Sequence, residues 1–475
     1  MGKRLDCLFV RPNNQKVVYP GLEEAHLTAI EPPLWAAILA GYLRFHKYGV
    51  DILDAQIESL SYEETAKRIN DRNPLLTVLS VSGSNPSAST MNMMGVEGLA
   101  PLIRSPVLVH GLHASALPAE TAAMKGVTYA CQGEGFHTIP LLLEALETNY
   151  AEAIDHIGGL WTPDTVWKDY PTLLDITHIP RPAWDLLPIK RYRAHFYMCF
   201  DGRPRSPYAL LYTSLGCPYP CTFCCINALF GERTFRVRDE DEVLSELKRL
   251  VDTYGVSNIK IMDEMFTLRK GRVISLCNRI ARMNLGLNMR AFARIDYIDD
   301  YLLEAMKKAG INWIVYGFES GSQKVLDTME KGTHIENMRK VVEMTRKHGI
   351  LVDGDFMMGG EGDNDETHKE TFQLMLELQC AWTNIYTTMP FPGSPLFTTA
   401  QKGGWVPPRH FTGYSQYTPD THPLRGEWAT RWRDWAFNSY NSNPSYRMSL
   451  RRRFGDSAVR MIDNMLKVPL RRNYS

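Results

Sequence analysis

Short apolar runs alternate with helix-periodic stretches between residues 5 and 149. In the stretch at 33–49, Leu34, Ile38 and Tyr42 fall on one helical face. Apolar runs with helical crossovers between them are typical of a Rossmann-like, doubly wound parallel sheet. The five predicted strands lie at 6–10, 50–54, 75–81, 106–111 and 127–133.

The loops that follow four of these strands are rich in Gly, Ser, Asn and His. In a doubly wound sheet, ligands bind beyond the carboxyl ends of the strands, where glycine lets the backbone approach them closely. Tight turns without a ligand would use the same residues. Four such loops in one sheet favour a binding site, and they lie at 11–15, 82–89, 110–118 and 132–138.

A second alternation of strands and helices occupies residues 206–397. It follows a connector at 150–205, whose six prolines and weak periodicity predict an extended path over the surface. Six strand and helix repeats predict a partial (β/α)6 barrel of the TIM type, with chemistry at the carboxyl ends of its strands. The predicted strands lie at 207–216, 258–263, 288–294, 313–319, 351–358 and 382–389.

Residues 398–475 form a basic tail, since residues 401–475 hold 13 Lys or Arg against 5 Asp or Glu. Basic residues among aromatic ones could bind nucleic acid, an anionic membrane face or an acidic substrate. The spacing of Trp428, Trp432 and Trp435 instead favours a helical cap over the barrel mouth, with these side chains buried. The arginines at 451–453 indicate a possible peripheral membrane contact or a lipid-linked substrate, and no nucleic acid is expected.

Length and composition agree with a globular protein of two or three domains. The chain has 475 residues, of which 44% are hydrophobic and 22% charged. No stretch approaches the roughly 18 apolar residues of a membrane span, and the first residues do not read as a signal peptide. Five cysteines are scattered singly in apolar context, which favours a reducing compartment, so we expect a cytoplasmic protein.

The other four cysteines lie within residues 217–225. Cys217, Cys221 and Cys224 bring three thiols into one loop, which suits zinc or an iron–sulfur cluster. Structural zinc normally takes four ligands, and the nearest histidine, His195, lies across a predicted strand. Metal-free buried thiols are disfavoured because Gly and Pro make this segment a turn. An iron–sulfur cluster is the favoured interpretation.

Three thiolates are one too few for a four-iron cluster. One iron would be left open, and an open coordination position is typical of a catalytic rather than a structural metal site. The fourth cysteine, Cys225, directly follows Cys224 and would have to point the other way. We predict that it faces the core, where free cysteine commonly packs as a small hydrophobe.

The spacing CPYPCTFC at 217–224 resembles the CxxxCxΦC signature of radical S-adenosylmethionine (SAM) enzymes, and the resemblance covers about 205–397. It implies a [4Fe-4S] cluster on Cys217, Cys221 and Cys224, whose open iron binds SAM for reductive cleavage to a 5′-deoxyadenosyl radical. It also implies an electron donor such as flavodoxin or ferredoxin.

The same resemblance implies which residues surround SAM. Salt bridges at the barrel rim are the alternative for the charged ones. A literal GGE at 359–361 follows the fifth strand, which is the wrong place for the family's GGE motif. The implied SAM residues are Phe223, Asp263, Glu264, Arg294, Glu319 and Ser320.

Residues 5–149 are similar to the cobalamin-binding domain fused to one large radical SAM class. There is no DxHxxG string, so cobalt would lack a histidine ligand from that motif. His110 and His113 are available, but a histidine in such a turn is more often a hydrogen-bonding residue. The residues that this resemblance places at cobalamin are Ser82, Ser84, Asn85, Gly111, His113, Gly133, Glu134 and Gly135.

Together these features predict a cobalamin-dependent radical SAM enzyme that methylates an unactivated carbon of a small biosynthetic intermediate. Such a carbon is no nucleophile, so a radical must activate it before a methyl group can be added. One alternative is ring formation or oxidation without methyl transfer, as in the magnesium-protoporphyrin ester cyclase relatives. A non-enzymatic corrinoid or iron–sulfur carrier is a remote alternative, because a carrier has no need of an open iron.

Overall fold

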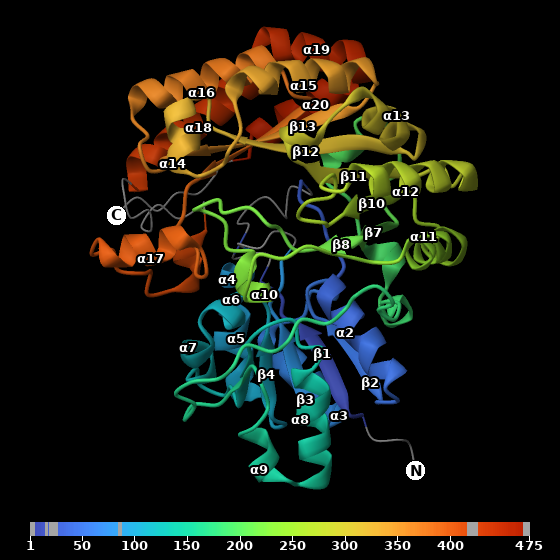
Figure 1. The fold of residues 1–475 in the computed structure, drawn as a ribbon, viewed down its shortest axis with the longest axis vertical. Coiled ribbons are helices and arrows are strands. Elements are labelled where there is room, and N and C mark those ends of the chain that lie inside the picture. The colour runs from blue at the N-terminus through green and yellow to red at the C-terminus, as the bar shows by residue number, and fades with distance from the viewer. Residues whose placement is uncertain (1–4, 15–17, 19–26, 84–87, 416–425, 469–475) are drawn as a thin grey trace.

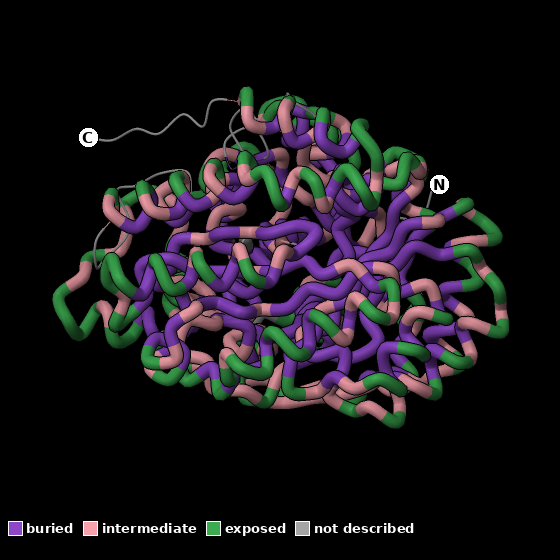
Figure 2. Tube along the Cα trace, turned by 90° about the horizontal axis from the view of Figure 1, so that it is seen from above, coloured by how far each residue is buried: buried purple, intermediate pink, exposed green. Residues whose placement is uncertain are grey.

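Two parallel sheets, one above the other and each flanked by helices, form the body of the chain (Figure 1). The computed structural model describes residues 5–14, 18, 27–83, 88–415 and 426–468. The N-terminal sheet lies in the lower half of Figure 1 and the second sheet in the upper half. Figure 2 shows that the central strands are buried and that exposed residues lie on the outer helices and loops.

The first sheet has the strand order β2-β1-β3-β4-β5-β6. Its first five strands are parallel, which confirms the predicted doubly wound sheet. The short β6 pairs antiparallel with β5 at one edge and was not predicted. The strands are β1 (Cys7–Arg11), β2 (Val50–Asp54), β3 (Leu76–Ser80), β4 (Val107–His110), β5 (Tyr129–Cys131) and β6 (Leu160–Trp161).

Helices cover both faces of this sheet. Cys7 and Phe9 of β1 belong to one buried cluster with α2 and α8, whereas Leu8 and Val10 belong to another with α3 and α5. Successive side chains of a strand point to opposite faces, so each face has its own apolar layer. The helices are α2 (Leu34–Phe45), α3 (Tyr62–Arg72), α4 (Ala88–Asn92), α5 (Met94–Leu99), α6 (Leu112–Ala116), α7 (Pro118–Ala122), α8 (Thr138–Thr148) and α9 (Ala151–Ile154).

The second sheet is fully parallel and has the order β14-β13-β12-β11-β10-β7. Each of its strands overlaps one predicted barrel strand. The strand predicted at 207–216 is split in two, because β7 ends at Leu211 and β8 (Ser214–Leu215) pairs antiparallel with β9 (Arg236–Val237), which was not predicted. The six strands are β7 (Tyr208–Leu211), β10 (Asn258–Ile261), β11 (Asn288–Ala293), β12 (Ile311–Glu319), β13 (Leu351–Met358) and β14 (Trp382–Thr387).

This second sheet curls into an open barrel. Side chains from all six strands line one cavity, and among the described strands the outer two, β7 and β14, do not pair with each other. The helices of this part are α10 (Asn227–Phe230), α11 (Glu240–Tyr254), α12 (Lys270–Met283), α13 (Asp300–Lys308), α14 (Gln323–Thr328), α15 (Ile335–Lys347), α16 (Asp365–Leu378) and α17 (Pro395–Lys402).

The predicted surface path of the connector is wrong for its second half. Trp184 and Tyr192 are fully buried, and Tyr197 stacks on Trp382 of β14 with ring centroids 4.5 Å apart. The sequence shows little periodicity here because the segment uses three short 3-10 helices, whose side chains fill gaps between larger elements. These are η2 (Trp184–Leu186), η3 (Ile189–Arg191) and η4 (Phe196–Cys199).

The C-terminal region is helical, as predicted, and its first helix both covers the edge strand β14 and contributes Arg433 and Phe437 to the wall of the cavity in the open barrel. Arg433 Nε donates to the carbonyl of Ile385 in β14 (2.9 Å), and Tyr440 donates to the carbonyl of Cys380 just before β14 (2.9 Å). The predicted burial is wrong for Trp435, which is 47% exposed. The helices are α18 (Gly426–Ser442), α19 (Pro444–Phe454) and α20 (Asp456–Leu466).

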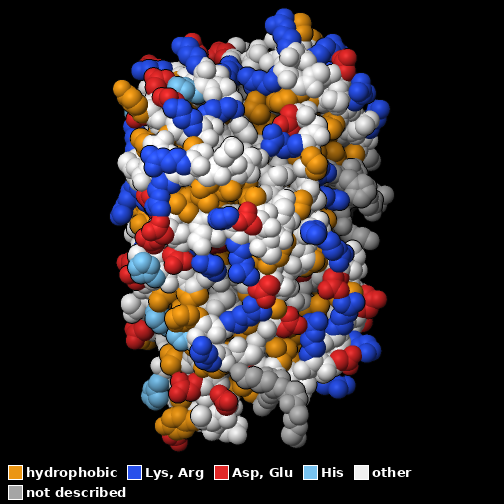
Figure 3. All heavy atoms as spheres, turned by 90° about the vertical axis from the view of Figure 1, so that its right-hand side faces the viewer, with side chains coloured by type: hydrophobic (Ala, Val, Ile, Leu, Met, Phe, Trp, Pro, Cys, Tyr) orange, Lys and Arg blue, Asp and Glu red, His pale blue; other side chains and the backbone are white. Residues whose placement is uncertain are grey.

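Charged side chains of both signs are interspersed over the face shown in Figure 3. This face therefore carries no continuous basic stripe of the kind that binds nucleic acid. Within the described part of the chain, every helix is too short or too polar to cross a lipid bilayer.

Packing between α2 and the connector predicts an effect of adding one methyl group. A Cβ on Gly41 would lie 2.1 Å from the carbonyl oxygen of Arg181. We expect Gly41→Ala to lower the free energy of unfolding by about 1–3 kcal/mol, because backbone must move to relieve the overlap. Thermal unfolding of the purified protein would measure it.

Gly271 in α12 provides the matched control, because a Cβ there would have nothing within 4 Å. Gly271→Ala should leave the unfolding midpoint unchanged or raise it slightly, since alanine favours a helix more than glycine does. Equal midpoints for the two variants would contradict the close packing of α2 on the connector.

Candidate active site

A cavity of about 790 Å³ lies between the two sheets and extends into the open barrel. The first domain contributes Arg11, Ser80 and Ser82 from the carboxyl ends of β1 and β3. The cysteine loop contributes Cys224 and its neighbours to the same wall. Two segments predicted to bind different cofactors therefore open onto one space.

The backbone of the cysteine loop is held at its start and at its middle. Gly216 has φ +95°, and a Cβ there would lie 2.4 Å from the carbonyl oxygen of Thr234, so glycine is required. At the middle of the loop, the Thr222 N–H donates to the carbonyl of Met329 (3.0 Å), and the Thr222 carbonyl accepts from the Leu396 N–H (2.8 Å). The three thiols are thus presented by a constrained loop.

Burial separates Cys225 from the other three cysteines of the loop. Cys225 is 3% exposed and packs in the main apolar cluster, as predicted, whereas Cys217, Cys221 and Cys224 are only partly buried. Within the described residues, no three His, Cys, Asp or Glu side chains converge closely enough for a single metal ion.

The donor set fits a cluster that supplies positive charge. Burial raises the pKa of the Cys224 thiol to about 12, and charge on Cys221 and Cys217 raises it further. Burial likewise raises the pKa of Cys217. Bound metal overcomes such a penalty because it stabilises the thiolate directly. The Lys331 ammonium is close enough to Cys224 to favour its thiolate as well.

Asp263 and Glu264, predicted at SAM, both contact the segment before the cysteine loop. The buried Asp263 carboxylate accepts from the Thr213 N–H (2.6 Å) and from the hydroxyls of Thr213 and Ser214 (both 2.5 Å). Glu264 accepts from the Gly216 N–H (2.9 Å), and burial raises its pKa to about 8. Their contact with SAM stays a prediction. Both carboxylates stabilise residues 213–216, which lead into the cysteine loop.

Phe223 and Glu319 are the predicted SAM residues that line the cavity. Glu319 has φ +63° at an irregularity in the pairing of β12 with β13, and its carboxylate accepts from Lys331 Nζ (2.7 Å). Lys331 Nζ also lies 5.8 Å from the centre of the Phe223 ring. Glu319, Lys331 and Phe223 therefore form one group beside Cys224.

Arg294 is buried and stands over the Tyr219 ring of the cysteine loop, with the guanidinium carbon 3.8 Å from the ring centre. It also donates to the Asp296 carboxylate (2.6 Å) and to the Lys331 carbonyl (2.8 Å). These contacts fix the cysteine loop against the end of β11 and the turn after α14. Arg294 therefore forms a salt bridge at the barrel rim, as the alternative to SAM binding expected.

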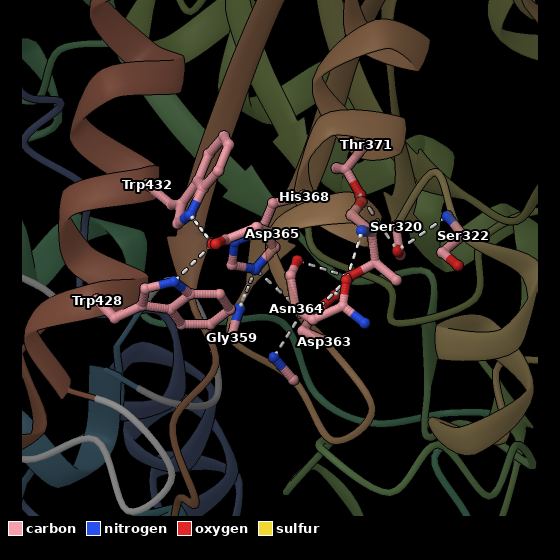
Figure 4. Close-up of polar contacts among 12 residues, drawn as sticks. Ser320, Ser322, Gly359, Asp363, Asn364, Asp365, His368, Thr371, Trp428 and Trp432 are labelled. Carbon is pink, nitrogen blue, oxygen red and sulfur yellow. Dashed lines mark hydrogen bonds and ion pairs between the residues drawn. The ribbon is translucent and has the colours of Figure 1, made fainter.

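Ser320, also predicted at SAM, lies in a polar network shown in Figure 4. Its hydroxyl lies 3.2 Å from that of Thr371, which also accepts from the Gly321 N–H (2.9 Å). The segment that includes the GGE at 359–361 is fixed nearby, because the Gly359 N–H donates to His368 Nε2 (2.9 Å). These are structural contacts of the loops after β12 and β13.

The predicted cobalamin residues lie where the parallel strands end, but most of them face inward. His113 is buried with Nδ1 3.2 Å from the Thr90 hydroxyl, and His110 Nε2 lies 3.1 Å from the Glu134 carbonyl. Burial lowers the pKa of each histidine to about 4. Neither lines the cavity, which agrees with the expectation that they make hydrogen bonds rather than bind cobalt.

The three glycines among the predicted cobalamin residues occupy tight backbone turns. Gly111 (φ +147°), Gly133 (φ +95°) and Gly135 (φ +86°) all have φ values that favour glycine. Ser82 lines the cavity, while Ser84 and Asn85 lie outside the described residues. The cobalamin contacts of the set stay predictions.

Glu134 links the two domains. Its carboxylate accepts from Arg236 Nη2 (2.6 Å) and Nη1 (3.0 Å), and Arg236 belongs to β9, which pairs with the strand before the cysteine loop. Burial raises the pKa of Glu134, whereas Arg236 lowers it. A two-point contact of this kind fixes orientation as well as distance.

Sequence reasoning missed much of the cavity wall. The charged side chains inside the barrel carried no motif, because their spacing of two residues is that of any buried strand. The inward-facing strand positions were nevertheless readable from that period. Seven residues that the sequence analysis did not single out line the cavity, and they are Glu31, Lys260, Arg290, Phe292, Asp355, Asn384 and Tyr386.

Two family models match the chain. Residues 211–375 match the radical SAM superfamily, and residues 25–143 match the B12 binding domain. The radical SAM match covers β10 to β13 of the second sheet, and the B12-binding match covers β2 to β5 of the first.

Curated relatives cover most of the chain. It is 28% identical over 376 residues to an uncharacterized methyltransferase of Pyrococcus horikoshii, across 78% of each chain. It is 24% identical over 453 residues to the cytidylyl-2-hydroxyethylphosphonate methyltransferase of Streptomyces wedmorensis, across 83% of each. It is 26% identical over 404 residues to the anaerobic magnesium-protoporphyrin IX monomethyl ester cyclase of Cereibacter sphaeroides, across 82% of this chain and 63% of the cyclase.

Solved structures share the fold. The radical SAM methyltransferase TsrM of Kitasatospora setae, with cobalamin and a [4Fe-4S] cluster bound, aligns with TM-score 0.66 and 18% identity over 89% of this chain and 83% of its own. The cobalamin-dependent SAM radical enzyme OxsB, with aqua-cobalamin and SAM bound, aligns with TM-score 0.69 and 16% identity over 97% of this chain and 72% of its own.

The difference in burial within the cysteine loop predicts which thiols hold iron. Serine at Cys217, Cys221 or Cys224 should remove most of the iron and the broad visible absorption of the anaerobically reconstituted protein. Cys225→Ser should retain both, because this buried side chain packs in the apolar cluster. Iron and sulfide analysis together with absorption spectra would measure the difference, and loss of the cluster in Cys225→Ser alone would contradict the assignment.

Proposed function

We propose that this chain, which belongs to the radical SAM enzymes that carry a B12-binding domain, methylates an unactivated carbon of a small biosynthetic intermediate. Its cofactors are a [4Fe-4S] cluster, SAM and cobalamin. We assign the cluster to Cys217, Cys221 and Cys224, and SAM to the wall beside Phe223 and Glu319.

The observation that carries the proposal is the single cavity between the domains. It is bounded by the strand ends of the B12-binding domain on one side and by Cys224 and Phe223 on the other. Methyl transfer to a carbon needs the methyl donor and the radical source to reach the same substrate atom. A shared cavity meets that requirement, and the protein then supplies orientation and exclusion of water.

When bound, the cluster and SAM supply the radical that activates the substrate, and cobalamin supplies the methyl group. The chain's own side chains shape the space in which this happens. Trp35 of α2 and Tyr212 after β7 lie with ring centroids 6.0 Å apart and both line the cavity. Their aromatic surfaces close the seam between the domains and keep water from a reactive centre.

Ring formation without methyl transfer is the second candidate. It is favoured by the similarity to the cyclase of Cereibacter sphaeroides, and it would use the same cofactors and the same cavity. The two candidates differ in the fate of SAM. Methyl transfer consumes one SAM as a methyl donor and another as the radical source, whereas ring formation consumes only the second.

Products of SAM turnover therefore test the proposal. The protein would be purified without oxygen, reconstituted with iron, sulfide and cobalamin, and supplied with SAM and a reductant such as flavodoxin or dithionite. We expect S-adenosylhomocysteine and 5′-deoxyadenosine together, with both lost in Cys217→Ser. The Cys225→Ser variant serves as the control that retains the cluster.

5′-Deoxyadenosine without S-adenosylhomocysteine would favour ring formation or oxidation. Neither product, from protein with a full complement of iron, would rule out both enzymatic candidates.

A further inference from the structure

We propose that Asp355 in the barrel interior binds a protonated amine of the substrate. The inference rests on the proposed function in one respect, since it takes the cavity as the place where the substrate reacts. It adds a chemical class for that substrate and a residue that selects it.

The barrel interior is unusually charged. Bulky aliphatic side chains normally fill the inside of such barrels. Here Lys260 of β10, Arg290 of β11 and Asp355 of β13 all point inward and line the cavity. Charges are costly to bury unless they have partners, so an interior of this kind indicates a polar ligand.

The other charges of this interior already have partners. Arg290 Nη2 donates to the Asp353 carboxylate (2.5 Å), and Lys260 Nζ lies 3.3 Å from the Glu31 carboxylate. Each cation is thus balanced by one carboxylate. Asp355 is the carboxylate in excess.

Asp355 receives one hydrogen bond, from the Asn384 side-chain amide to Oδ1 (2.8 Å). Among the described residues, no Lys, Arg or His nitrogen lies within 4.0 Å of its carboxylate. Asp353, on the same face of β13, is fully buried, whereas Asp355 is only partly buried and opens onto the cavity. Asn384 therefore orients a carboxylate whose second oxygen is free to accept.

An ammonium group suits this position better than an anion does. An anion would meet the excess carboxylate, and both nearby cations are already neutralised. An ammonium would pair with Asp355 and leave the interior neutral. Tyr386 also lines the cavity, and its ring can stabilise a cation, whereas the Phe292 ring already has Lys260 and Arg290 over it.

The ionisation of Asp355 gives the interaction a distinctive pH dependence. Burial and the charge of Asp353 together raise the pKa of Asp355 to about 8, although the Asn384 hydrogen bond and Arg290 oppose the shift. Below this pKa, an ammonium must displace a proton to bind. Its affinity should therefore rise by roughly tenfold per pH unit up to about pH 8 and then level off. The ionisable groups that interact electrostatically with Asp355 are Asp353, Lys260, Arg290, Glu319, Tyr197, Cys380 and Tyr386.

Binding of three small probes would test the proposal. Benzylamine, benzyl alcohol and phenylacetate share a ring and differ in charge. Calorimetry would be carried out on the holoenzyme with cluster and cobalamin, with and without SAM. We expect benzylamine to bind at least about tenfold more tightly than the other two, because a hydrogen bond between two charged groups is stronger than one that involves a neutral group.

The variant Asp355→Asn should lose that preference while retaining its cobalamin and iron content. Asp164→Asn, at an exposed carboxylate outside the cavity, is the matched control and should bind all three probes like the wild type. The pH dependence needs only the wild-type protein, so it tests the proposal even if Asp355→Asn does not fold.

Three results would overturn the proposal. They are equal affinity for benzylamine and benzyl alcohol, benzylamine binding that survives unchanged in Asp355→Asn, and benzylamine binding that SAM displaces. The last would assign Asp355 to SAM instead of the substrate. The two proposals can fail independently, because a protein that forms no S-adenosylhomocysteine can still bind benzylamine preferentially.

Discussion

An open barrel has two edge strands and a hollow interior. The rest of the chain is arranged so that it covers these edges and lines this interior. Edge strands carry unpaired backbone groups that must be covered or hydrated. At β14, Arg433, Tyr440 and Tyr446 from the C-terminal helices donate to carbonyls in and just before the strand. At β7, the Tyr208 hydroxyl donates to Glu31 of the first domain (3.0 Å). The domains and the tail thus complete the barrel together.

This arrangement explains which features could be predicted from sequence. The eleven apolar runs corresponded to parallel strands because buried strands need a continuous apolar pattern, whichever elements surround them. The cysteine loop was readable because its chemistry is local. The connector was misjudged because Trp184 and Tyr197 are buried by contacts far along the chain, to α11 and β14. Trp435 was misjudged because helical spacing defines a face without showing which neighbour covers it.

Charged residues were the hardest to place. Arg290 and Asp353 lie 63 positions apart, and neither belongs to a recognisable motif. The alternating pattern places both on the inner face of their strands, but only the register of the sheet brings them together. The same limit applied to Glu134, whose partner Arg236 lies 102 positions away in the other domain. Pairs of this kind depend on the tertiary fold.

The domain interface and the charge balance of the barrel interior depend on each other, because one ion pair, Lys260 with Glu31, belongs to both. Lys260 is 2% exposed and burial lowers its pKa, so without Glu31 it would be an uncompensated buried charge. Removing one partner of a buried pair costs about 3–5 kcal/mol, far more than a surface pair is worth. Glu31 comes from the loop before α2, so the first domain must be seated before the barrel interior is electrically balanced. Seating the first domain and balancing the charge of the barrel interior therefore depend on the same ion pair.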